Sequence, residues 1–106
     1  GWHIPNEAEW QVLVNFVSSG SGYATAASYL KNILAPNSFM ASPQGFYYLN
    51  QIPAFTSSPK ASFFWTSSYD PVAAKIVARG INEQTPSLSR YLSGGIDAFP
   101  VRCLKD

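Results

Sequence analysis

The side chains with the widest chemical range in this chain of 106 residues are a single histidine, His3, and a single cysteine, Cys103. A histidine that acts as a general base needs a nucleophile within hydrogen-bond reach and a third group to orient it. Serine is abundant, but no Gly-x-Ser-x-Gly elbow presents one as a nucleophile. We therefore expect no catalytic role for His3 and interpret it as a structural hydrogen-bonding group near a helix start.

Metal binding requires clustered histidine, cysteine, aspartate or glutamate side chains, and the sequence offers no such cluster. One histidine and one cysteine are too few for an ordinary structural zinc site. Asp70 and Asp97 stand alone in the sequence, and Glu7 and Glu9, two positions apart on an expected helix, point away from each other. We expect neither a metal nor another cofactor.

The remaining candidates for ligand binding are aromatic and polar residues on expected loops. Tyr48, Asn50, Tyr69 and Asp70 have polar neighbours, so a sugar or a peptide could stack on the rings and hydrogen-bond there. The alternative is that they are ordinary exposed residues. The other prominent aromatic residues are expected in the core, because aromatic side chains dominate small cores: Trp2, Trp10, Phe63, Trp65 and Phe99.

The composition is that of one globular domain, residues 1–106. Hydrophobic residues make up 46% of the chain and charged residues 12%, about half the usual share of roughly 25%. The net charge of +1 and the absence of a basic block argue against nucleic-acid binding. No apolar run approaches the ~20 residues that span a bilayer. Polarity from Ser, Thr, Asn and Gln is compatible with secreted and surface domains.

Two helices are expected in the first third of the chain. Asn6 and Glu9 have the spacing of a capping box that starts a helix at about residues 7–18. Trp10, Leu13, Val14 and Val17 then form one apolar stripe along this helix. A shorter helix is predicted over residues 24–32, with its inward side chains at Ala26, Ala27 and Leu30.

Short strands are expected in the rest of the chain. They are predicted at residues 45–49, 63–67, 73–78 and 87–92, with a final strand that places Phe99, Val101 and Cys103 on one face. Residues 73–78 are expected to have one wetter face, with a helix as the rival interpretation. Turns are predicted at residues 43–44, 50–53 and 57–60, and a hairpin turn at residues 93–95. Helices followed by hairpin-linked strands predict an α+β domain with helices on one face of an antiparallel sheet.

Five segments in order resemble the Fibrobacter succinogenes major paralogous domain, a family of bacterial surface and secreted domains. Residues 1–10 are similar to its Gly-Trp-His-hydrophobic-Pro-Thr-x-x-Glu-Trp opening, and residues 99–106 to its Phe-Ser-Val-Arg-Cys-hydrophobic-Lys-Asp ending. Residues 29–31, 39–47 and 64–68 match the segments between. Asn6, Thr66 and Ala98 depart from the pattern, and residues 32–37 look short, which puts a binding loop there in doubt.

The resemblance implies a C-type lectin-like fold with adjacent, paired termini, and a bacterial cell-surface location. It does not imply a calcium-dependent sugar site, because the Glu-Pro-Asn or Gln-Pro-Asp and Trp-Asn-Asp motifs of such lectins do not occur. From the capping box, the aromatic core and the lone cysteine, we expect structural roles for the following residues: Asn6, Glu9, Trp10, Trp65 and Cys103.

The single cysteine leaves two interpretations open. Family members often carry a cysteine just before the Gly-Trp-His opening, which implies that Cys103 pairs with a cysteine outside this sequence. A bridge closing ~100 residues would contribute roughly 4 kcal/mol in the chain-entropy model. The alternative is a buried, unpaired core thiol.

We therefore predict a non-enzymatic extracellular module of a longer bacterial surface protein, secreted or lipoprotein-anchored, that binds a ligand or mediates adhesion. The partner would be a glycan or a protein, alongside the other domains of the parent chain, without membrane insertion. One alternative is a purely structural spacer. Another, a relative of formylglycine-generating enzymes, is disfavoured because their chemistry needs paired reactive cysteines.

Overall fold

The computed structural model describes residues 1–19, 22–31, 46–48, 54–56, 61–82, 85–95 and 97–106. The chain forms a small α+β domain whose paired strands are all antiparallel. The helices are α1 (Glu7–Val17) and α2 (Tyr23–Lys31). The strands, in chain order, are β1 (Trp2–His3), β2 (Phe46–Tyr48), β3 (Ala54–Thr56), β4 (Ala61–Asp70), β5 (Lys75–Asn82), β6 (Leu88–Ser93) and β7 (Leu104–Lys105).

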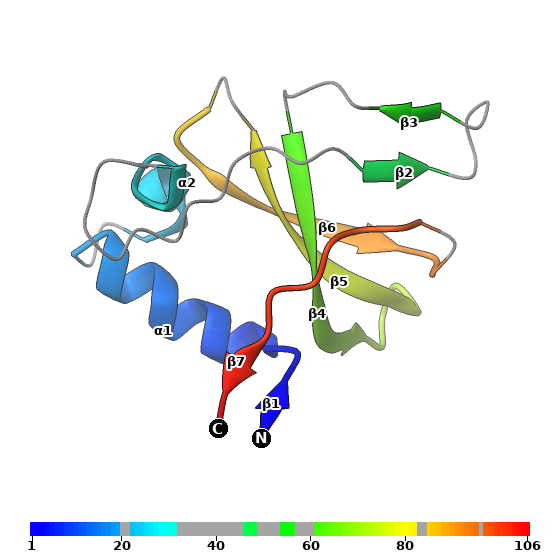
Figure 1. The fold of residues 1–106 in the computed structure, drawn as a ribbon, viewed down its shortest axis with the longest axis horizontal. Helices are drawn as coiled ribbons and strands as arrows, with labels where there is room; N and C mark the ends of the chain where they lie inside the picture. The colour runs from blue at the N-terminus through cyan, green and yellow to red at the C-terminus, as the bar shows by residue number, and fades with distance from the viewer. Residues whose placement is uncertain (20–21, 32–45, 49–53, 57–60, 83–84, 96) are drawn as a thin grey trace.

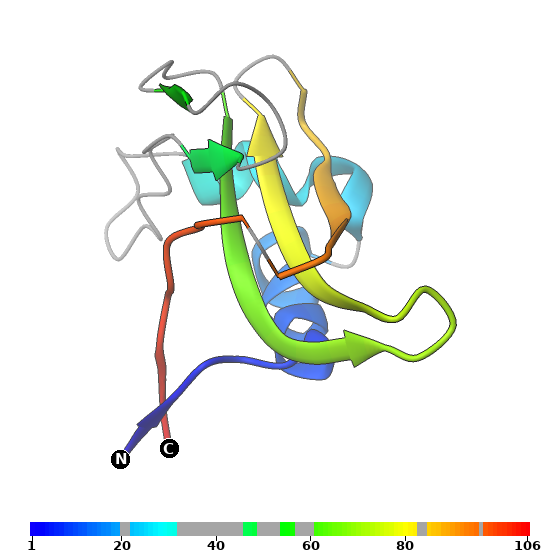
Figure 2. The same ribbon diagram turned by 90° about the vertical axis from the view of Figure 1, so that its right-hand side faces the viewer.

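The strands pair as β1–β7, β2–β3 and a central β4–β5–β6 sheet. Both helices lie on one side of the central sheet, and the segment between β6 and β7 crosses the other side (Figures 1 and 2). β1 pairs with β7 in the register Trp2 with Lys105 and His3 with Leu104. The two ends of the described chain therefore lie side by side, as Figure 1 shows.

Helix α1 begins at the predicted capping box. The Asn6 side chain accepts a hydrogen bond of 3.0 Å from the Glu9 backbone N–H, and the Glu9 carboxylate accepts one of 2.9 Å from the Asn6 N–H. These bonds satisfy two N–H groups that a helix start leaves without intrahelical partners. The helix ends one residue before the predicted boundary, where the Ser18 hydroxyl donates to the Val14 carbonyl at 2.6 Å.

The core lies between the helices and one face of the central sheet. Trp10 and Val14 of α1 are buried, and Leu13 and Val17 pack partly against the same cluster, as the predicted stripe requires. In α2, the three residues predicted to face inward, Ala26, Ala27 and Leu30, are fully buried. The small side chains of the two alanines allow the helix to approach the sheet closely. The sheet contributes Phe64, Ile81 and Leu88 to this core.

An aromatic cluster covers the opposite face of the sheet. Phe99 lies over Trp65, Phe63 and Tyr91, with ring centroids 4.6, 5.2 and 5.8 Å away. Gly80 of β5 is required beneath it, because a Cβ there would lie 2.6 Å from a Phe63 ring carbon. The predicted core position of Phe99 is confirmed, and Phe63 and Trp65 are half-buried.

The outer edge of β4 is covered by both ends of the chain. The Ser67 N–H donates to the Pro5 carbonyl at 3.0 Å, and the Trp65 N–H donates to the Pro100 carbonyl at 3.2 Å. These contacts satisfy edge groups that would otherwise be available to another strand. They also tie the segments that flank β1 and β7 to the central sheet.

Three expectations about the strands are wrong. The strand predicted at residues 73–78 is confirmed only from Lys75, where β5 begins, because residues 73–74 lie in the preceding turn. The expected wetter face is wrong from Val77 to Ile81, because the helices cover one side of β5 (Figure 2). The rings of Phe63 and Phe99 cover the other side. β6 is followed by a turn but not by a hairpin partner, since β7 pairs with β1. Trp2 is 69% exposed, not part of the core.

The predicted final strand is also wrong. Phe99 is buried, whereas Val101 and Cys103 are exposed, and only Leu104 and Lys105 form a strand. Pro100 accepts a hydrogen bond from the Trp65 N–H but has no N–H of its own, so it cannot donate one to β4 in return. The interpretation of Cys103 as a core thiol fails with it.

The expectations for residues 32–60 are tested only at two short strands. The strand predicted at residues 45–49 is confirmed as β2, which pairs with β3, a strand that the sequence did not predict. The turns predicted at residues 43–44, 50–53 and 57–60, and the short segment 32–37, lie outside the described residues.

Candidate functional site

The structure places two of the four predicted ligand-binding residues at one hairpin. Tyr69 and Asp70 end strand β4, directly before the turn of residues 71–74 that leads to β5. Tyr48 ends β2 opposite Ala54, and its side chain is outside what the structure describes. Asn50 lies outside the described residues. The candidate site is therefore the tip of the β4–β5 hairpin.

Asp70 holds the turn in one shape. Its Oδ1 atom accepts hydrogen bonds from the backbone N–H groups of Val72 at 3.0 Å and Ala73 at 2.9 Å. Such a local side-chain to backbone arrangement is typical of aspartate at turns. Ala74 adopts a left-handed φ of 54°, which returns the chain to β5. The Asp70 carboxylate therefore organises the hairpin, and its role in ligand binding stays a prediction.

A bulge in β4 sets the direction of this hairpin. Trp65 pairs with Ala78 and Tyr69 with Ile76, so residues 66–68 stand opposite Val77 alone. The Thr66 hydroxyl bridges the gap by donating to the Val77 carbonyl at 2.8 Å and accepting from the Ser68 N–H at 3.1 Å. Bulges bend a strand, and β4 turns sharply near its end in Figure 2.

Four charged side chains join the base of this hairpin to α1. Arg79 on β5 and Arg90 on β6 occupy directly opposite positions on neighbouring strands. Two like charges in such positions repel each other unless a negative charge lies nearby. Glu7 supplies that charge: its Oε1 accepts from Arg79 at 2.6 Å and from Arg90 at 2.8 Å. Arg90 also donates to Glu7 Oε2 at 3.0 Å and to Asp70 at 3.1 Å.

Arg79 is the buried member of this cluster. Its side chain is 8% exposed, and its guanidinium carbon lies 4.4 Å from the centre of the Tyr23 ring of α2. The Arg79 Nε is buried without a hydrogen-bond partner, so the ring face and the Glu7 carboxylate are what stabilise this cation. The cluster therefore connects both helices to the sheet.

The hydrogen bonds keep the acidic groups of this cluster ionised. The pKa of Glu7 is lowered, mainly by hydrogen bonds from Arg90, with the charge of Arg79 adding to the shift. The pKa of Asp70 is lowered by the backbone N–H of Ala73 first and by Arg90 next, and the pKa of Arg90 is raised by Glu7 and Asp70. The carboxylates of Glu7 and Asp70 are therefore used in contacts within the fold, whereas Tyr69 and Val72 beside them are exposed.

A second charged cluster joins the chain ends. His3 lies between two carboxylates, with Nε2 2.8 Å from Glu9 and Nδ1 2.6 Å from Asp106. Only the imidazolium form donates from both nitrogens. Accordingly the pKa of His3 is raised above 6.5, by the hydrogen bond to Glu9 first and by that to Asp106 next. The predicted structural role of His3 is confirmed.

Four of the five residues expected to have structural roles make the expected contacts, and Cys103 does not lie in the core. Asn6 and Glu9 form the capping box, Trp10 is buried, and Trp65 packs against Phe99. Cys103 is exposed, and its pairing with a cysteine outside this sequence stays a prediction. Asp97, expected to be isolated, accepts a hydrogen bond of 2.6 Å from the Ser93 hydroxyl.

Sequence reasoning missed the partners of these groups. Arg79, Arg90 and Asp106 were not singled out, because their contacts with Glu7 and His3 join residues far apart in the chain. One signal was present: arginine among apolar residues of a strand needs a counter-charge if that face is covered.

Within the described ranges, no three or more His, Cys, Asp or Glu side chains gather where they could hold a metal ion. No helix in this part of the chain is long and apolar enough to cross a membrane. Comparisons of the chain with protein-family models, curated proteins and solved structures found no match.

Proposed function

We propose that this chain is a non-enzymatic, extracellular binding module of a bacterial surface protein, secreted or lipoprotein-anchored, with a C-type lectin-like architecture. The order of two helices and then antiparallel strands, with β1 and β7 paired at the chain ends, supports that architecture. The ligand is a glycan or a surface protein.

The observation that carries the proposal is the rigid presentation of exposed apolar groups at the β4–β5 hairpin. Tyr69 is 60% exposed and Val72 is 97% exposed. Asp70 fixes the turn between them through two backbone hydrogen bonds, and Arg90 anchors Asp70 to the sheet. An exposed aromatic side chain next to a turn with a fixed backbone supplies contact area with little backbone ordering on binding, which favours a sugar ring or an apolar side chain as ligand.

A glycan array combined with pull-down from surface extracts tests this proposal. Tyr69→Ala should reduce retention of the captured glycan or protein at least tenfold, and Tyr69→Phe should retain most of it if stacking dominates. Phe16→Ala is the matched control, because Phe16 is an 83% exposed aromatic residue on α1, away from the hairpin. Equal losses in Tyr69→Ala and Phe16→Ala, or no ligand in either assay, would contradict the proposal.

A second candidate function is a structural spacer that binds nothing itself. The use of Glu7, Asp70 and Arg90 in contacts between α1 and the sheet favours it, because these charges stabilise the fold rather than meet a partner. In that case Tyr69→Ala and Val72→Ser would leave adhesion of cells carrying the parent protein unchanged, whereas deletion of the domain would alter it. A relative of formylglycine-generating enzymes gains no support from a single exposed Cys103.

A further inference from the structure

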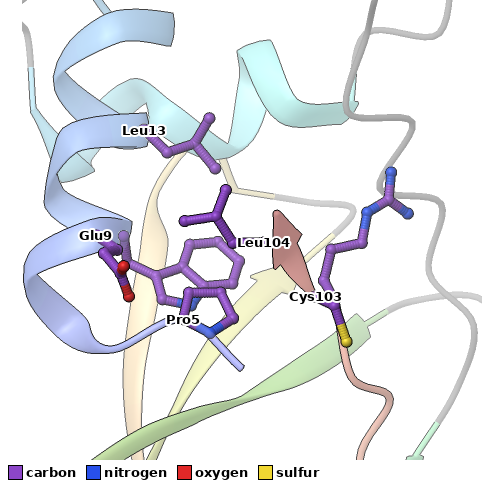
Figure 3. A pocket seen from close by; sticks show the side chains of 7 residues that line it. Pro5, Glu9, Leu13, Cys103 and Leu104 are labelled. Atoms are coloured by element: carbon purple, nitrogen blue, oxygen red, sulfur yellow. The ribbon is translucent and has the colours of Figure 1, made fainter. Parts of the chain in front are cut away.

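A pocket of about 190 Å³ opens between α1 and the C-terminal strand, apart from the hairpin. Trp10 and Leu13 of α1 form one wall, and Pro5 closes one end. Leu104 of β7 faces them, and Arg102 and Cys103, which precede it in the chain, complete the lining on that side. In Figure 3, the Leu104 side chain points toward Leu13 and Pro5. The pocket is therefore built where the paired ends of the chain dock on the first helix.

The lining favours a neutral, apolar ligand, because its two charged residues, Glu9 and Arg102, carry opposite charges. Glu9 borders the pocket, but both of its carboxylate oxygens already accept hydrogen bonds, from His3 at 2.8 Å and from the Asn6 N–H at 2.9 Å. A cationic ligand would have to displace one of these bonds. Leu104 remains 44% exposed and Leu13 is half-buried, so a ligand would cover apolar surface on both walls.

The volume limits the size of the ligand. An apolar cavity of about 150 Å³ lined by aliphatic and aromatic side chains is enough to bind benzene. Pockets for drug-sized molecules are larger, roughly 300–1,000 Å³. A volume of about 190 Å³ therefore fits one six-membered ring with a short substituent.

We propose that the pocket between Leu13 and Leu104 binds a small neutral molecule with a single aromatic ring. The ring lies between the two leucine side chains, beside Trp10 and Pro5. This site is separate from the hairpin tip, so each proposal can fail without the other.

Titration with toluene, followed by methyl NMR of the leucines, tests the proposal. Saturable shifts are expected at Leu13 and Leu104, with much smaller shifts at Leu30 and Leu88, which are buried in the core. Absence of a saturable shift, or equal shifts at all four leucines, would overturn the site.

Two pairs of variants localise the binding. Leu104→Phe places a ring in the pocket and should weaken toluene binding at least tenfold, whereas Val101→Phe, at a 47% exposed position outside the pocket, should leave it unchanged. Leu13→Phe against Val12→Phe repeats the comparison on α1, where Val12 is 70% exposed. Equal effects within both pairs would overturn the assignment.

Discussion

The two glutamates in the first turn of α1 belong to two charge clusters that differ in burial and in their dependence on pH. Glu7 meets Arg79 and Arg90, and Arg79 is nearly buried beneath Tyr23. Glu9 meets His3, whose side chain is 39% exposed and whose charge depends on pH. Two glutamates, two residues apart, therefore form one set of ion pairs that stays charged around neutral pH and one ion pair whose charge depends on the protonation of His3.

The largest effect is expected from breaking the Glu7 cluster. Glu7→Gln leaves the buried Arg79 without its carboxylate partner and opposite Arg90, which keeps only Asp70. This should lower the free energy of unfolding by about 1–3 kcal/mol. The estimate is below that of a fully buried pair because Arg90 is 39% exposed to screening solvent. Urea denaturation measures the change. The comparison fails if Glu9→Gln, in the exposed cluster, destabilises the protein more than Glu7→Gln does.

A smaller loss is expected from removing the helix cap beside the His3 cluster. Asn6→Ala deletes the acceptor for the Glu9 N–H, and should cost about 1 kcal/mol in thermal or urea unfolding. Asn6→Asp keeps an oxygen acceptor and serves as the control. A loss in Asn6→Asp equal to that in Asn6→Ala would show that the cap hydrogen bond is not what matters.

The smallest effect is a pH dependence confined to the His3 cluster. The pKa of His3 is raised in the folded protein, so its stabilising contribution is complete below 6.5 and is lost as pH rises through the folded value. The pKa of Glu9 is lowered from 4.5, by the Asn6 N–H first and by His3 next, so its contribution is present above 4.5 and is lost at lower pH.

The stability difference between the unmodified protein and His3→Gln should therefore be greatest between pH 4.5 and 6.5 and should shrink toward pH 9. Denaturant midpoints across this range measure it. Repeating the series with Glu7→Gln is the control, because its deficit should stay nearly constant from pH 5.5 to 9, over which Glu7 and both arginines remain charged. A constant difference for His3→Gln would contradict the prediction.

Local patterns predicted the helices well. The spacing of Asn6 and Glu9 is enough to locate the start of α1, and Ala26, Ala27 and Leu30 identify the inner face of α2, because these signals act within one or two turns. Tyr69 and Asp70 were predicted on a loop, but they are the last two residues of β4, directly before a turn. No local pattern could show that Asp70 would be used by Val72, Ala73 and Arg90.

The errors arose where distant segments meet. Alternation around Val77 and Arg79 indicated a wet face, but α1 brings Glu7 to that face and makes a buried arginine acceptable. Cys103 followed an apolar pattern that predicted a core strand, yet β7 found its partner at the opposite end of the sequence. Pairings over such separations depend on the whole topology, which local patterns do not reveal; only the family resemblance pointed to paired chain ends.

The two proline carbonyls on the edge of β4 have a consequence for synthesis. Pro5 is translated before β4 and Pro100 after β6, and both carbonyls accept hydrogen bonds from that edge. A nascent chain that has emerged only as far as β6 can form the central sheet while the Trp65 N–H still lacks its acceptor. Until the segment with Pro100 emerges, that part of the edge can pair with a neighbouring chain, so we expect products truncated before Pro100 to aggregate more readily than chains that contain it.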